Sequence, residues 1–258
     1  MQDDDIRFDI DNQRIATITL DRAHKHNALT LAMLDAIDHA LVQVERSAAR
    51  VLLFRSASER FFCAGADIRE WGDIDPAAMG TRFIRAGNRV FRRIVELDVP
   101  TVAVLNGSAL GGGLELALAC DLRYAAASAR LGFPEAAVGA IPGWLGGTRL
   151  AALAGVGRAR EMVLLGEAVD AERAARWGIV NEAVPDAQLD ARVAAVCETL
   201  RSRSSVSQSV AKRVLRASAQ TDGIGDVLHE LAASTCKATP DAEEGVAAFR
   251  EKRAARFG

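Results

Sequence analysis

The sequence predicts an α/β protein in which strands come early and helices dominate the last hundred residues. Short apolar runs rich in β-branched residues lie in the first 135 residues, for example RIATITL at 14–20 and VPTVAVL at 99–105. Helical spacing of apolar residues follows, without an internal repeat or a low-complexity linker. We therefore expect an α/β core over residues 1–200. A helical region over residues 201–258 should pack on that core or on a neighbouring subunit.

The first half of the chain is predicted as follows. Strands 6–10 and 14–20 form a hairpin around the turn at 11–13. Thr30 and Asp67 precede apolar helical patterns and are expected to be N-caps. In order, we expect helix 31–45, strand 51–54, a loop at 56–66, helix 68–71, helix 76–97 with a solvated row of arginines, strand 101–105, helix 113–119 and strand 122–125.

The second half contains a glycine- and proline-rich loop and then mostly helices. The stretch ARLGFPEAAVGAIPGWLGGTRL, from residue 129, should be a structured loop with at most a short strand at 131–133. Helices are expected at 147–154, 157–165, 171–177, 189–201, 206–219, 224–236 and 240–253.

Composition excludes several classes of protein. The net charge of −2 gives no support for nucleic-acid binding. The four cysteines, Cys63, Cys120, Cys197 and Cys236, are widely spaced, which indicates reduced thiols. The acidic N-terminus does not resemble a signal peptide, and no apolar run is long enough to span a membrane. We expect a cytoplasmic protein, and the frequent Ala and Arg indicate a bacterial source.

The segment NGSALGGGLELALACD, residues 106–121, is the first candidate site. Three glycines lie where a buried strand becomes a helix, so the free N–H groups of the first helical turn and the helix dipole would favour a negative oxygen. Glu115 follows in an apolar run, where a carboxylate needs a role or a partner. The segment fits neither the phosphate-binding glycine motifs nor a nucleophile elbow. A plain strand-to-helix joint with a hydrogen-bonded glutamate remains the alternative.

Glu135, in LGFPEAAVGAIPG, is the second acidic candidate. Alone it could be an ordinary glutamate at a helix start. Paired with Glu115 in a low-dielectric pocket, it would give two carboxylates with separated pKa values, as general acid/base chemistry requires.

The loop FCAGAD, residues 62–67, is a second glycine-containing turn before a helix. It could be a simple connector, or it could supply further free backbone N–H donors. Two such loops together would form an oxyanion hole for a thioester or another carbonyl. The histidines, His24, His26, His39 and His229, are scattered, so no metal site is predicted.

Together, these motifs resemble the enoyl-CoA hydratase/isomerase, or crotonase, family. The resemblance rests on HNAL at 26–29, FCAGADIRE at 62–70, the two segments around Glu115 and Glu135, and EGVAAFREKR at 244–253, in the family's order. It implies a crotonase-like spiral of β-β-α units with a helical C-terminal region that drives assembly into a homotrimer or a homohexamer.

The resemblance also implies roles for individual residues. The N–H groups of Ala66 and Gly112 match the oxyanion hole, Glu115 the residue that orients and deprotonates water, and Glu135 the residue that exchanges the proton at the α-carbon. Gly143 matches a glycine whose N–H helps to hold that water. Residues that match the CoA groove are His24, Lys25, His26, Ala64, Asp67 and Ile68, with Phe249 and Lys252 reaching the CoA of an adjacent subunit.

The activity implied is hydration of a trans-2-enoyl-CoA to a 3-hydroxyacyl-CoA, with the coenzyme A thioester as substrate and no permanently bound cofactor. A Δ3-Δ2 enoyl-CoA isomerase that uses Glu135, or a non-catalytic acyl-CoA-binding paralogue, is the alternative. Two features depart from the family's pattern: Arg22-Ala23 lacks a proline, and Trp144 stands next to Gly143. Trp144 is either a wall of the acyl pocket or an outward-facing anchor of its loop.

Overall fold

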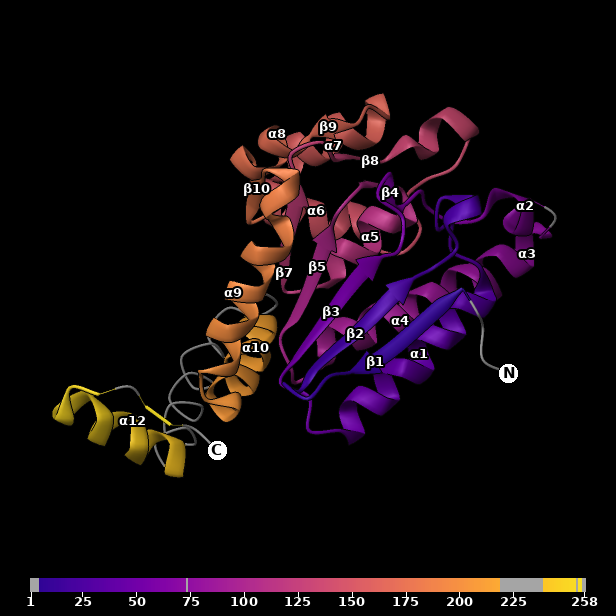
Figure 1. Cartoon of the computed structure of the whole chain (residues 1–258). Coiled ribbons are helices and arrows are strands. Elements are labelled where there is room, and N and C mark those ends of the chain that lie inside the picture. Colours follow the sequence, from indigo (N-terminus) through magenta and orange to yellow (C-terminus); the bar gives the residue numbers. More distant parts are fainter. Residues whose placement is uncertain (1–4, 73, 219–238, 254, 257–258) are drawn as a thin grey trace.

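The computed structural model describes residues 5–72, 74–218, 239–253 and 255–256, and two sheets lie at its centre (Figure 1). The larger sheet has the strand order β1-β2-β3-β5-β7-β10, and the smaller one has the order β4-β6-β8-β9. The strands are β1 (Ile6–Ile10), β2 (Ile15–Leu20), β3 (Val51–Ser56), β4 (Phe61–Cys63), β5 (Thr101–Leu105), β6 (Ser108–Leu110), β7 (Leu122–Ala126), β8 (Arg130–Gly132), β9 (Val169–Asp170) and β10 (Glu182–Val184).

The helices follow or connect these strands. They are η1 (Ala23–Lys25), α1 (Leu31–Arg46), α2 (Ile68–Trp71), α3 (Pro76–Ala78), the π-helical η2 (Met79–Ile84), α4 (Arg85–Glu96), α5 (Gly112–Ala119), η3 (Pro134–Val138), α6 (Gly146–Ala154), α7 (Val156–Leu165), α8 (Ala171–Arg176), η4 (Asp186–Gln188), α9 (Leu189–Arg201), α10 (Ser205–Ser218) and α12 (Pro240–Glu251).

Three successive units, each of two strands and a helix, build the two sheets. In β3–β4, β5–β6 and β7–β8, the first strand enters the larger sheet and the second enters the smaller one. Strands β3, β5 and β7 are parallel to one another, and so are β4, β6 and β8. The helices α2, α5 and η3 come after the second strands. This is the spiral of β-β-α units that the sequence resemblance implies.

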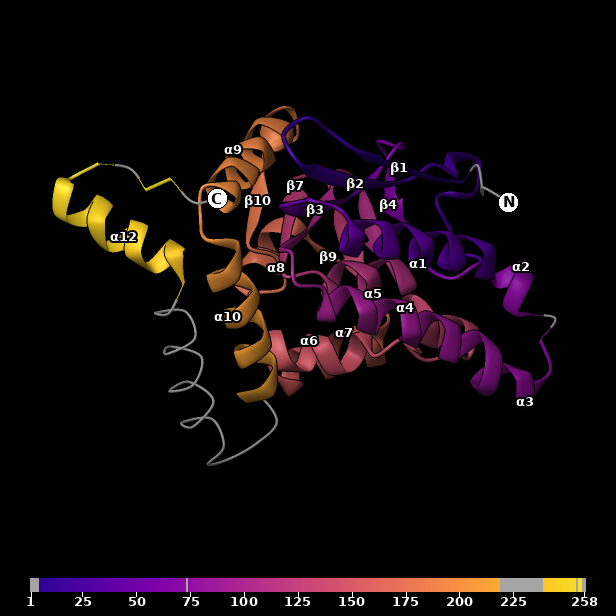
Figure 2. The same cartoon turned by 90° about the horizontal axis from the view of Figure 1, so that it is seen from below.

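The core lies between the larger sheet and the helices on one of its faces. Figure 2 shows α1, α4 and α5 together on that face. Every residue of β5 is buried, and α5 is buried on all sides, which explains why its sequence is almost uniformly apolar. Helix α5 therefore has a fixed position, and so has its first turn.

Several predicted elements are confirmed. The antiparallel pair β1–β2 is the predicted hairpin. The Thr30 hydroxyl accepts a hydrogen bond from the Met33 N–H (3.1 Å) at the start of α1, and Asp67 caps α2 through the Arg69 N–H (2.9 Å). The predicted helix 76–97 is also present, although its segment η2 is π-helical.

Two expectations about strands are wrong. Residues 56–66 are not all loop, because Phe61–Cys63 form β4 beside β6. Strands are not confined to the first 135 residues either, because β10 extends the larger sheet in parallel with β7 and β9 pairs with β8. These strands have two or three residues each, which is too short for a visible alternation of apolar and polar side chains.

The C-terminal region is helical where the structure describes it. Helix α10 is tied to the core by ion pairs of Lys212 with Asp121 and of Arg213 with Asp98, both 2.6 Å. Helix α12 stands apart from the sheets in both views (Figures 1 and 2). The predicted helix 224–236 and Cys236 lie outside the described residues, and the division at residue 200 stays a prediction.

Candidate active site

The candidate residues come together because three parallel neighbouring strands end at the same edge of the smaller sheet. The chain leaves β4 through 64–67, β6 through Gly111 and β8 through Phe133. Since carboxyl ends of parallel strands meet at one edge, these connections lie side by side. They carry Ala66, Gly112 and Glu135, so three of the predicted site residues share one location.

The first two connections approach each other at backbone distance. A methyl group built on Gly112 would lie 3.3 Å from the amide nitrogen of Ala66, and one on Gly65 would lie 3.6 Å from the amide nitrogen of Gly112. Gly65 and Gly111 have φ values of +119° and +50°, which disfavour residues with a side chain. Among the described residues, neither the Ala66 nor the Gly112 N–H donates to a carbonyl. The structure thus brings together two free amide donors, as the sequence predicts.

Helix α5 adds its dipole to these donors. The helix starts at Gly112, and its first internal bond runs from the Glu115 N–H to the Gly111 carbonyl (3.0 Å). The N–H groups before that bond point out of the helix start, where partial positive charge accumulates. A negative oxygen at this place would be stabilised by both the donors and the dipole.

Glu115 lies in the first turn of α5 and is 2% exposed. Its Oε1 accepts hydrogen bonds from the Trp144 N–H (2.7 Å) and the Gly146 N–H (2.8 Å). Burial raises the pKa of Glu115 to about 7 against the opposing effect of these two bonds, and the charge of Glu135 raises it further. Near neutral pH the carboxyl group can therefore both release and accept a proton.

Glu135 lies in η3 and faces the same space. A methyl group on Gly111 would lie 2.9 Å from Glu135 Oε1, so the carboxyl group reaches over the start of α5. Its Oε2 is buried and has no hydrogen-bond partner among the described residues. Burial raises the pKa of Glu135 as well. The two carboxyl groups interact electrostatically, and both favour the protonated form more than a glutamate in water does.

Trp144 points inward, so the interpretation as an outward-facing anchor is wrong. The side chain is 1% exposed and packs against the rings of Phe83 and Phe91, with centroids 5.3 and 5.4 Å away. The loop is closed by Arg149, whose Nη1 donates to the Trp144 carbonyl (2.8 Å). Trp144 therefore contributes its backbone to the Glu115 site and its indole to the neighbouring core.

Gly143 lies one residue before this contact. The donors to Glu115 are the N–H groups of Trp144 and Gly146, and no described hydrogen bond joins Gly143 to Glu115. A methyl group on Gly143 would lie 2.5 Å from Ile84 Cδ1, so the glycine allows its loop to approach η2. Its role in holding water stays a prediction.

The loop around His24, Lys25 and His26, which is predicted to bind CoA, has a strained backbone and is held by hydrogen bonds of a buried side chain. His26 and Asn27 both have positive φ (54° and 55°). Buried Asn27 accepts from the Arg22 N–H (2.7 Å) and donates to Ser56 Oγ (2.7 Å) and the Phe62 carbonyl (3.0 Å). The loop is thus held in one conformation, as a preorganised binding surface must be.

Other predicted CoA residues adjoin this loop. Arg22 Nη1 pairs with Asp67 Oδ2 at 2.7 Å, and the Ala64 N–H donates to the His26 carbonyl (3.0 Å), so the loop and the connection after β4 form one unit. The side chains of His24, His26 and Ile68 are exposed, and Lys25 is half-buried. They are available to a ligand.

The predicted tail residues are not near these loops in this chain. Lys252 is exposed and follows the end of α12. Phe249 belongs to α12, and its side chain lies outside what the structure describes. Helix α12 lies far from β4 and α5 in Figure 1. Their approach to an adjacent subunit's CoA stays a prediction.

Sequence reasoning missed several residues that shape the site. Asn27 is part of the HNAL motif at 26–29, but the sequence pattern does not indicate that its side chain is buried. The importance of three further residues is visible only in the structure. Gly146 donates to Glu115, Arg149 donates to the Trp144 carbonyl, and Gly87 lies against the Trp144 ring. Gly146 could have been noticed as the first glycine of GGTRL, at a helix start.

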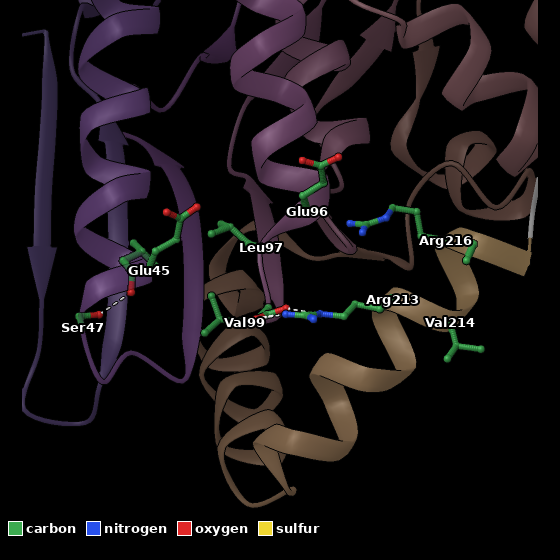
Figure 3. A pocket seen from close by; sticks show the side chains of 11 residues that line it. Glu45, Ser47, Glu96, Leu97, Val99, Arg213, Val214 and Arg216 are labelled. Atoms are coloured by element: carbon green, nitrogen blue, oxygen red, sulfur yellow. Dashed lines mark hydrogen bonds and ion pairs between the residues drawn. The ribbon is translucent and has the colours of Figure 1, made fainter. Parts of the chain in front are cut away.

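A separate groove of about 760 Å³ lies away from these residues, between the C-terminal ends of α1 and α4 and helix α10 (Figure 3). Its lining combines charged and apolar residues, and Arg213 pairs with Asp98 across it. No predicted site residue lines it.

Within the described ranges, no group of His, Cys, Asp and Glu could hold a metal ion, and none of the described helices is long and apolar enough to cross a membrane.

Comparison with known proteins shows the family of this chain. The family model for enoyl-CoA hydratase/isomerase matches residues 11–258. The chain is 34% identical over 242 residues to a short-chain-enoyl-CoA hydratase of Clostridium acetobutylicum (93% of this chain, 92% of the relative). It is 35% identical over 248 residues to a crotonyl-CoA hydratase of Syntrophomonas wolfei (95% of each).

A solved structure is similar to this chain over nearly its whole length. An enoyl-CoA hydratase from Bacillus anthracis superposes with a TM-score of 0.93, at 34% identity and over 98% of each chain. The chain belongs to the enoyl-CoA hydratase/isomerase, or crotonase, family.

Proposed function

We propose that this protein adds water across the double bond of a trans-2-enoyl-CoA to give a 3-hydroxyacyl-CoA. The observation that carries the proposal is the pair of carboxyl groups, Glu115 and Glu135, with raised pKa values beside two free amide donors. Hydration needs one group to take a proton from water and another to give one to carbon. An isomerase needs a single base.

The thioester oxygen would accept hydrogen bonds from the Ala66 and Gly112 N–H groups. As water attacks C3, electrons move through the conjugated system to this oxygen, and the intermediate is an enolate. The two donors and the start of α5 stabilise its charge. Because the donors are fixed by packed backbone, they need no rearrangement during the reaction.

The protons would then move between water, substrate and the two glutamates. Ionised Glu115, with Oε1 held by Trp144 and Gly146, takes a proton from the attacking water through Oε2. Protonated Glu135 gives its proton to C2, and the enolate collapses to the saturated thioester. The product has gained one water, and exchange with solvent restores both carboxyl groups.

The rest of the proposal concerns binding and assembly. The CoA part of the substrate would lie along His24, Lys25 and His26 and beside Ala64, Asp67 and Ile68, with no permanently bound cofactor. Phe249 and Lys252 would reach a neighbouring subunit's substrate in a homotrimer or homohexamer. We infer a cytoplasmic location.

The test follows the absorbance of the conjugated thioester when the protein meets crotonyl-CoA or 3-butenoyl-CoA. A hydratase consumes the first, whereas an isomerase forms conjugated product from the second. We expect Glu115→Gln and Glu135→Gln each to lose nearly all hydration. Glu59→Gln, a change at an exposed glutamate, should retain it. Turnover of 3-butenoyl-CoA without any hydration would instead identify an isomerase.

A further inference from the structure

The indole of Trp144 occupies a slot between two helices beside the oxyanion donors. A methyl group on Gly112 would lie 2.5 Å from Trp144 Cζ3, and one on Gly87 would lie 2.3 Å from Trp144 Nε1. The two opposite edges of the indole thus touch the start of α5 and the middle of α4. The slot exists because both positions are glycine, since a side chain at either would overlap the ring.

The slot lies where an acyl chain would need room. In the mechanism proposed above, the reacting carbons would lie between Glu115 and Glu135, next to Gly112. The apolar side chains that continue from Gly112 into the protein are Trp144 and, behind it, Phe83 and Phe91. Since Trp144 is 1% exposed, this volume is filled by the protein itself.

The indole N–H makes no hydrogen bond within the part of the chain that the structure describes. Its Nε1 is buried and has no partner among the described residues, although a buried indole N–H usually has one. Whereas the backbone N–H of Trp144 holds Glu115, its ring fills the slot and packs against Phe83 and Phe91.

We propose that the Trp144 indole, held between Gly87 and Gly112, is the end wall of the acyl pocket and restricts the enzyme to short 2-enoyl thioesters. This inference rests on the hydratase function proposed above. It assigns chain-length selection to the side chain of Trp144, while its backbone N–H positions Glu115.

The test is the chain-length profile of kcat/KM for trans-2-enoyl-CoA esters with four, six, eight and ten carbons. Wild type should prefer four carbons to eight by about tenfold or more, because an eight-carbon chain has to displace the packed indole, and forcing extra methylenes into a filled site costs about that much. Trp144→Leu and Trp144→Ala should raise the eight-to-four ratio in order of decreasing side-chain volume. The ratio is the readout, so a general loss of activity does not affect it.

Two further variants separate a pocket wall from a structural tryptophan. Trp177, beside Arg173 at the end of α8, is the matched control, and Trp177→Ala should leave the ratio unchanged. Gly87→Ala alone should lower stability and activity, because its methyl group displaces the indole. The same change should have little further effect in the Trp144→Ala variant, where the indole is absent.

The outcomes distinguish the two proposals. Hydration of all four chain lengths at similar kcat/KM by wild type would overturn the role of Trp144 and leave the hydratase intact. Hydration of none of them would overturn the hydratase, and the role of Trp144 with it. If Trp144→Ala does not fold, the chain-length profile of wild type and the eight-to-four ratio of Trp144→Leu still test the role of the indole.

Discussion

Glu115→Gln should abolish hydration and at the same time make the fold more stable above neutral pH. The folded protein raises the pKa of Glu115 from its ordinary value of 4.5 to about 7, mainly through burial. Between these values the folded state holds a proton that the unfolded state releases. Stability is therefore lost as pH rises through this window, and the full penalty is present above about 7.

The size of the effect follows from the same difference. A change of about 2.5 in pKa corresponds to about 3 kcal/mol, since one pKa unit is worth about 1.4 kcal/mol. Glutamine is neutral at every pH, and its amide oxygen can still accept from the Trp144 and Gly146 N–H groups. The variant should thus gain up to about 3 kcal/mol over wild type at pH 8 relative to pH 4.5, or about 6–12 °C in Tm.

The assay is unfolding of both proteins by heat or urea at pH 8 and at the acidic end of the window. Protein concentration is kept fixed because subunit assembly would shift the midpoint. Glu59→Gln, at an exposed position, is the control and should show no pH-dependent gain. An equal difference between Glu115→Gln and wild type at both pH values would refute the argument that Glu115 holds a costly buried charge.

Three other predictions concern the site and the assembly. Gly112→Ala should lower kcat/KM by about a hundredfold or more, because its methyl lies 2.5 Å from Trp144 Cζ3 and 3.3 Å from the Ala66 nitrogen, whereas Gly157→Ala, in open space on α7, should be neutral. The pH profile of kcat/KM should be bell-shaped, because the reaction needs Glu115 ionised and Glu135 protonated and burial raises the pKa of both; a flat profile from about pH 5 to 9 would contradict the assignment. Light scattering at micromolar concentration should give the mass of a trimer or hexamer, and a monomer would contradict the proposed assembly.

Part of the fold could be predicted from local signals. Thr30 and Asp67 cap helices as expected, and the apolar run LELALA predicts the complete burial of α5. The short strands could not be predicted, because Phe61–Cys63 and Ser108–Leu110 become strands only by pairing with each other and with β8. Their pairing is what brings the three site loops to one edge.

The candidate site divides in the same way. Glu115, Glu135, Ala66 and Gly112 could be proposed from their surroundings and from the family resemblance, and the structure places them together. The direction of Trp144 could not be predicted, since it depends on Gly87 in a different helix. Nor could the support that Asn27 gives to the loop, which comes from contacts with Ser56 and Phe62.

The most direct test of the central claim is the mass of the product formed from crotonyl-CoA in isotopically labelled water. The account predicts a 3-hydroxybutyryl-CoA that carries one oxygen from the solvent, formed by wild type and not by Glu115→Gln or Glu135→Gln. Labelled product at the wild-type rate from either variant would contradict the acid/base pair. Unchanged substrate with wild type would contradict the hydratase.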